Sequence, residues 1–439
     1  MTGRGTVIRR GTSAAVILAF VVIAPAAGAK TALDSSEKTY ARECIDLNAS
    51  DEELIGICQQ ALDEGGYGRV QHLQILEALG HAYRWTRQFD EAEVQYRRIL
   101  DLDPRSTRGL NGLGWVAYAR EDFAAAAGHF EASVAVNPTN DGLGGFGGAG
   151  FRAGRLDIDT AVGYLDAALA LNDTDRWTLR EKGWILLDVH RYEAALAAFQ
   201  AAIALEAEDA NAHEGAARAL AELQRYAAAL THILKAGELN PDDLDVLIWR
   251  SHISRWNGNN LRALRDAELV IRKAPELSDG VVLKARAQAA MGFDQLALTT
   301  LRDAFAEFEN DDFLRYWLAE MLRRDEQFEE ALAIMAANVA AEAPDGYDLK
   351  LYANLALELG RLDEARQVLE RASEVAPWLV ELGYYRARLL VLEGRYDDAE
   401  AAFAEAVEAG LPASYAADLA QLMIKQGEML RAVVFGKRY

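Results

Sequence analysis

The sequence has few of the residues that build metal or redox centres. Its 439 residues include two cysteines and seven histidines, and no histidines stand at the HExxH spacing of a zinc site. It also lacks the Gly-x-Ser-x-Gly elbow and the P-loop. We therefore expect no metal, no cofactor, no small-molecule ligand and no catalysis. The acidic pairs Asp311-Asp312 and Asp397-Asp398 are interpreted as residues that begin helices rather than as a catalytic dyad.

Positive charge is scarce. The chain has 68 Asp and Glu against 46 Lys and Arg, which gives a net charge of −22. This excess repels polyanions, so we expect no nucleic-acid partner and no attraction to anionic membrane surfaces. The hydrophobic content of 51% and the eight prolines favour a globular, helical chain.

Long apolar runs are absent after the first 30 residues. Arg4, Arg9 and Arg10 precede the short apolar stretch SAAVILAFVVIAP, and the small residues of Ala27-Gly28-Ala29 follow it. This pattern is typical of a signal peptide over residues 1–29, cleaved after about Ala29. We expect a periplasmic or secreted bacterial protein without a membrane span after cleavage. The alternative is an uncleaved signal anchor.

The two cysteines, Cys44 and Cys58, both lie near the expected mature N-terminus. In an exported protein, such a pair favours a disulfide. It would join the two arms of a helical hairpin, about residues 40–47 and 51–63, within an N-terminal cap over residues 30–72. The alternative is a pair of buried thiols.

Small residues recur about every 34 residues. With Leu73 as position 1, position 20 is alanine in nine of the ten copies; in the third copy one residue is inserted and the alanine is Ala161. A bulky residue usually follows four positions later. Seven of the eight prolines fall at the ends of copies. Position 8 is occupied by Gly80, Gly114, Gly148, Gly183, Ala217, Ser251, Ala285, Ala319, Ala353 and Ala387.

This pattern predicts a helix, a turn and a second helix in each copy. Small residues let the two helices cross closely, and proline ends the second helix. One such hairpin cannot bury its apolar face alone, so the copies stack. The first copy resembles the tetratricopeptide repeat through Leu76, Leu79, Gly80, Tyr83, Ala92, Tyr96 and Pro104.

The resemblance implies an all-α, right-handed superhelical solenoid of about ten repeats over residues 73–412. Capping helices over residues 413–439 would follow. In this family the first helices line a concave groove, largely through positions 2, 5, 9, 12 and 13. We therefore expect a protein or peptide partner to bind residues at these positions. The candidate binding residues are Arg84, Trp85, Arg108, Asn111, Trp115, Arg152, Trp177, Arg180, Trp184, Arg218, Arg255, Trp256, Arg286, Tyr316, Lys350 and Asn354.

Lys350 and Asn354 also resemble the start of the carboxylate clamp that some family members use to hold chaperone tails. The following repeats do not complete it. The expected function is an exported, non-enzymatic interaction scaffold, with envelope assembly, secretion and polysaccharide export as candidate processes. The alternative is a carbohydrate-binding solenoid whose tryptophans stack on sugar rings.

Glycines cluster in the segment from Gly142 to Gly154. The first six residues of this segment, GLGGFG, fit the Gly-x-Gly-x-x-Gly fingerprint of dinucleotide-binding loops. That fingerprint requires a preceding strand. Here the cluster falls in the first helix of the third repeat, so we expect no nucleotide. Because interior glycines weaken a helix, we expect either a hinge or a surface that a partner's backbone can approach closely.

Overall fold

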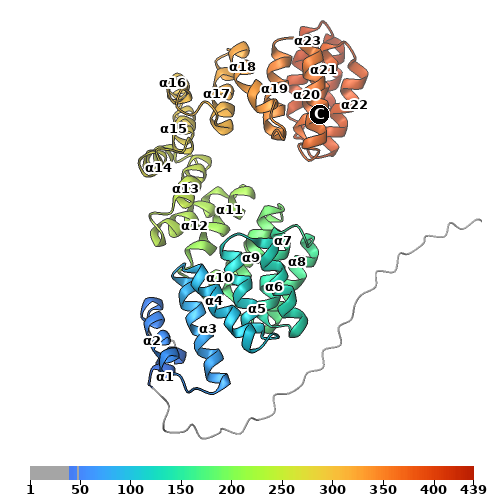
Figure 1. Ribbon diagram of the computed structural model, residues 1–439. Coiled ribbons are helices and arrows are strands. Elements are labelled where there is room, and N and C mark those ends of the chain that lie inside the picture. Colours follow the sequence, from blue (N-terminus) through green and yellow to red (C-terminus); the bar gives the residue numbers. More distant parts are fainter. Residues whose placement is uncertain (1–38, 47–48) are drawn as a thin grey trace, which may run out of the picture. The chain divides into compact units, whose positions relative to one another are not determined.

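The computed structural model describes residues 39–46 and 49–439. These residues form 24 α-helices and no strand, as predicted, and most helices pack against the next helix in the sequence (Figure 1). The chain divides into two compact units, one ending at Val116 and one beginning at Ala117. The expected signal peptide lies outside the described residues. No helix in the described part is long and apolar enough to span a membrane.

The helices alternate between first and second members of each pair. The first helices are α1 (Thr39–Asp46), α3 (Arg69–Trp85), α5 (Thr107–Ala119), α7 (Asn140–Arg152), α9 (Arg176–Asp188), α11 (Ala210–Glu222), α13 (Leu244–Trp256), α15 (Asp279–Ala290), α17 (Asp312–Arg324), α19 (Gly346–Glu358), α21 (Glu381–Leu392) and α23 (Tyr415–Lys425). The second helices are α2 (Asp51–Glu64), α4 (Phe89–Leu102), α6 (Phe123–Val136), α8 (Ile158–Leu171), α10 (Tyr192–Leu205), α12 (Tyr226–Leu239), α14 (Asn260–Lys273), α16 (Asp294–Phe305), α18 (Phe328–Val339), α20 (Leu362–Val375), α22 (Tyr396–Glu408) and α24 (Met429–Arg438).

Small and bulky residues meet where the helices of a pair cross, as the 34-residue pattern predicts. A Cβ atom placed on Gly80 would lie 2.9 Å from the ring of Tyr96. One placed on Gly183 would lie 2.7 Å from the ring of Phe199. Both rings are fully buried. Glycine therefore lets the first helix rest directly on the aromatic ring of the second.

From the pair of α3 and α4 onward, the turn inside each helix pair contains a residue with a left-handed backbone. Gly258, Gly292, Gly360 and Gly394 have φ values of 69° to 83° at this point. In other repeats the same place holds a residue with a side chain, such as Arg87 or His190, each with φ of 61°. This conformation ends the first helix and redirects the chain into the second.

The glycine cluster of α7 packs closely against its own chain. All residues from Gly142 to Gly150 are buried. A Cβ on Gly145 would lie 2.5 Å from Phe130, and one on Gly150 would lie 2.6 Å from Leu156. The interpretation of this cluster as a surface for a partner's backbone is therefore wrong, because side chains of this chain already fill the space. The same packing argues against a hinge.

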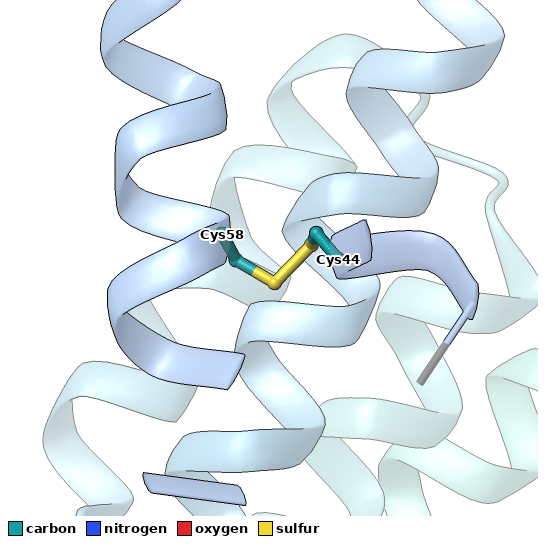
Figure 2. The surroundings of a disulfide bond; sticks show 2 residues. All are labelled: Cys44 and Cys58. Carbon is teal, nitrogen blue, oxygen red and sulfur yellow. A yellow bond between two sulfur atoms is a disulfide. The ribbon is translucent and has the colours of Figure 1, made fainter. Parts of the chain in front are cut away.

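The two cysteines lie together at the start of the described residues (Figure 2). Cys44 of α1 and Cys58 of α2 form a disulfide with sulfur atoms 2.04 Å apart, and both side chains are fully buried. Ser50 caps α2 by accepting a hydrogen bond from the backbone N–H of Glu53. Oxidation of the pair in the cell stays a prediction.

Two glycine substitutions distinguish the effect of close packing on stability from the effect of helix propensity. Gly145→Ala should lower the free energy of unfolding by about 1–3 kcal/mol, because the new methyl group meets the buried ring of Phe130. Gly128→Ala, in an open position of α6, should raise it by up to about 1 kcal/mol. Urea unfolding followed by circular dichroism measures both. A stability gain for both variants would contradict close packing in α7.

Candidate binding surface on the first helices

The first helices of the second unit form a continuous layer. Each helix in the series α7, α9, α11, α13, α15, α17, α19, α21 and α23 contacts the next member of the series. Within the part of the chain that the structure describes, successive second helices make no comparable contact. We call this series the first-helix layer. The first helices of neighbouring repeats therefore lie side by side on the surface that carries the predicted binding residues of this unit.

The predicted residues of the first unit lie on α3 and α5. Arg84 has its guanidinium carbon 4.5 Å from the centre of the Trp85 ring, and Trp85 is 63% exposed. Asn111 is buried and Trp115 is half-buried. Trp85 is thus the most open of these aromatic side chains.

Many of the predicted basic residues form ion pairs within the chain. Arg180 lies 2.6 Å from Asp209, which is the residue that caps α11. Such arginines hold neighbouring repeats together, and their charge is already compensated. Arg108 pairs with Glu77 and Lys350 with Glu381 in the same way, whereas Arg218 pairs with Glu214 four residues earlier in α11.

A hydrogen-bonded network surrounds Glu181 of α9. Arg152 of α7 donates to both of its carboxylate oxygens, at 2.7 and 3.2 Å, and the Tyr118 hydroxyl donates at 2.8 Å. Burial and the nearby Glu181 carboxylate raise the pKa of Tyr118. The ring of Tyr118 also meets the edge of Trp177 at 5.7 Å. Arg152 and Trp177 therefore have structural contacts of their own.

Aromatic rings and arginines stack along α9, α11 and α13. The guanidinium group of Arg218 lies between two indoles, 5.1 Å from the centre of Trp184 and 4.8 Å from that of Trp249. The Trp184 indole N–H donates to Asn211 at 2.8 Å. Cation–π contacts of this kind hold both partners in a fixed orientation.

A second aromatic group surrounds Trp256 at the end of α13. The Tyr226 ring stacks on it at 5.9 Å, and the His252 ring stacks on it at 5.5 Å. Arg286 of α15 donates to Nδ1 of His252 at 3.0 Å. Arg255 also lies beside Trp256. The structure therefore brings the predicted residues Arg255, Trp256 and Arg286 together.

The two residues that resemble the start of a carboxylate clamp, Lys350 and Asn354, already interact with side chains of this chain. Lys350 lies 3.8 Å from Glu381, and burial lowers its pKa. The side-chain oxygen of Asn354 accepts a hydrogen bond from Arg388 at 2.7 Å. Tyr316 is half-buried, and burial raises its pKa. A chaperone tail would have to displace these internal contacts.

Three residues of this surface, Trp249, Trp317 and His252, were not predicted from the sequence. Trp249 and Trp317 stand at position 6 of their repeats, outside the positions expected to line the groove, yet they contact Arg218 and Arg286. His252 stands at an expected position but was not singled out. The recurrence of tryptophan at position 6 in two repeats was the available signal.

The acidic pairs of the sequence lie at the N-terminal ends of helices. Among the described residues, no three His, Cys, Asp or Glu side chains are placed to hold a metal ion. Asp311 caps α17 by accepting from the backbone N–H of Leu314 at 2.7 Å. Asp397 and Asp398 lie in the first turn of α22. These placements agree with the interpretation of the acidic pairs as residues that begin helices.

Removing one carboxylate tests the structural role of the Arg152 network. Glu181→Ala should lower the free energy of unfolding by about 2 kcal/mol, because it removes the carboxylate that accepts from the partly buried Arg152 guanidinium and from the Tyr118 hydroxyl. Glu131→Ala, which breaks the exposed pair with Arg155, should cost about 0.5 kcal/mol or less. Equal losses in urea unfolding would contradict this assignment.

Known proteins match this chain in both sequence and fold. Family models described as tetratricopeptide repeat match residues 77–142, 180–243, 322–378 and 351–415. Tetratricopeptide repeat protein 37 of Xenopus laevis is 24% identical over 196 residues, covering 42% of this chain and 12% of that protein. Anaphase-promoting complex subunit 3 of Schizosaccharomyces pombe is 22% identical, covering 37% of this chain and 24% of that protein. The chain thus matches less than a quarter of each relative's length.

Among solved structures, yeast Tom70 aligns with a TM-score of 0.51 and 16% identity, covering 91% of this chain and 95% of that chain. A tetratricopeptide repeat protein from Parabacteroides merdae aligns with a TM-score of 0.48 and 16% identity, covering 57% of this chain and 98% of that one. The first of these likenesses supports the fold alone. The family models match more than half of the chain, so the chain belongs to the tetratricopeptide repeat family.

Proposed function

We propose that this protein is a non-enzymatic scaffold that binds a protein or peptide partner on the first-helix layer. Tetratricopeptide repeat proteins are protein-interaction scaffolds, and their fold is typically non-enzymatic. The observation that carries the proposal is the concentration of tryptophan, tyrosine and arginine on this layer, from Trp184 to Tyr347. These residue types dominate the binding energy of protein interfaces.

A protein partner fits the layer better than a glycan does. Stacking on a sugar ring requires an open indole face. Trp184 and Trp317 instead have arginine guanidinium groups against their rings, at 5.1 and 3.9 Å. Phe313 and Tyr347 are more open, 39% and 43% exposed, and they offer apolar contact to a peptide chain. A peptide carries both apolar side chains, which can pack on the open rings, and polar groups, which can accept hydrogen bonds from the guanidinium groups.

We place this binding outside the cytoplasm, in the periplasm or the secreted fraction. The proposal rests on the basic and apolar pattern of residues 1–29 and on the cysteine pair, which suits an oxidising compartment. Envelope assembly, secretion and polysaccharide export are the processes proposed for the scaffold.

Site-specific photocrosslinking tests where the partner binds. A benzoylphenylalanine residue at position 313 or 347 should form adducts with the same partner in living cells, since both positions are exposed on first helices. The matched controls are Leu261 of α14 and Leu296 of α16, which are 63% and 52% exposed on second helices. Equal yields of the same adduct from the control positions would contradict binding on the first-helix layer.

Intact mass spectrometry of the protein from its native cells tests the compartment. The mature chain should begin at about Lys30, and reduction should add two hydrogen atoms because Cys44 and Cys58 are paired. Recovery of a full-length chain with two free thiols would contradict export with cleavage.

A further inference from the structure

Two arginines of the first-helix layer have no carboxylate partner among the residues that the structure describes. Arg255 of α13 has its guanidinium carbon 5.6 Å from the centre of the Trp256 ring. Arg286 of α15 donates to Nδ1 of His252 at 3.0 Å and lies 3.9 Å from the centre of the Trp317 ring. Their contacts are thus aromatic rings and one imidazole. By contrast, Arg152 and Arg180 on the same layer have carboxylate partners.

The two positive charges act on each other. Burial, and then the charge of Arg255, lower the pKa of Arg286 to about 9. Burial, and then the charge of Arg324, lower the pKa of Arg255. Arg324 itself lies 3.1 Å from Glu320, so its own charge is partly compensated. Keeping both guanidinium groups charged therefore destabilises the free protein. This local positive charge persists although the chain as a whole carries a net charge of −22.

Neighbouring polar groups do not compensate this charge. Burial and the two arginines lower the pKa of His252 to about 3, so its imidazole is neutral at physiological pH and accepts the hydrogen bond from Arg286. The indole N–H of Trp317 is buried and has no acceptor among the residues that the structure describes. A buried donor without an acceptor destabilises the free protein. Among the described residues, Arg255 and Arg286 thus have no carboxylate acceptor, and an anion bound beside them could supply one.

We propose that Arg255 and Arg286 bind a carboxylate of an acidic segment in the partner protein. This inference rests on the proposed binding of a partner to the first-helix layer. A carboxylate accepts paired hydrogen bonds from a guanidinium group. An aspartate or glutamate in a peptide also brings little further negative charge, whereas nucleic acid would be repelled by the acidic chain.

A random library of displayed 12-residue peptides, selected on the full-length protein, supplies the probe. Selected sequences should share an aspartate or glutamate. In synthetic peptides, replacing that acid by its amide should weaken binding to the wild-type protein about tenfold or more. The same replacement should change binding to Arg255→Gln and Arg286→Gln variants by less than about twofold. Arg302→Gln, which removes an exposed charge on α16, should bind both peptides as the wild type does.

Each other outcome overturns a defined part of the account. Selected peptides without an acidic residue, crosslinked at positions 313 or 347, would overturn the carboxylate site and leave the scaffold function standing. Failure of any peptide to bind, together with no adducts at those positions, would overturn both. If a peptide with phosphoserine at the acidic position binds tightly and the same peptide with glutamate shows no measurable binding, the site binds a phosphate group and the carboxylate proposal is wrong.

Thermal unfolding separates a binding role from a structural one. Arg286→Met keeps an unbranched side chain against Trp317 and removes a charge that the free protein does not compensate. It should therefore unfold at the temperature of the wild type or above, while losing the preference for the acidic peptide. A large fall in the unfolding temperature, with the preference retained, would show that Arg286 acts only in the fold.

Discussion

Close approach of two helix backbones at small residues is the constraint on which the rest of this structure depends. Where Gly80 or Gly183 meets the ring of Tyr96 or Phe199, the space for a Cβ atom is missing. The bulky residue of the second helix is then buried against the backbone of the first. Because this contact recurs about every 34 residues, the same helix pair forms again and again along the chain.

The contact between successive first helices follows from this pairing, and it decides the electrostatics of the surface. Side chains of neighbouring repeats meet on the first-helix layer, so arginines such as Arg152 and Arg180 reach carboxylates one repeat away. Carboxylates of the same chain therefore compensate the positive charges of these arginines. Arg255 and Arg286 have aromatic neighbours instead. The same geometry thus produces both structural ion pairs and a site with uncompensated positive charge.

The sequence predicted the helix pairs and the family because small residues and prolines recur at fixed spacing. It could not predict which arginines are paired, since the partner depends on how one repeat rotates against the next. It also gave no sign that Arg87 and His190 would take the left-handed conformation that glycine takes in other repeats. That conformation is imposed by the closely packed helices on either side of the turn.

The glycine cluster of α7 shows how local propensity and packing can disagree. Seven glycines between Gly142 and Gly154 predict a weak helix, but their lack of side chains lets Phe130, Leu156 and Thr178 pack directly against the backbone. Burial of these neighbours offsets the low helix propensity.

Hydrogen–deuterium exchange of backbone amides in α7, compared with α9 and α11, tests this account most directly. If close packing at small residues stabilises the helix pairs, the amides of residues 142–150 should exchange as slowly as those of α9 and α11. Exchange in α7 that is orders of magnitude faster than in both neighbours would contradict the account and identify α7 as a hinge.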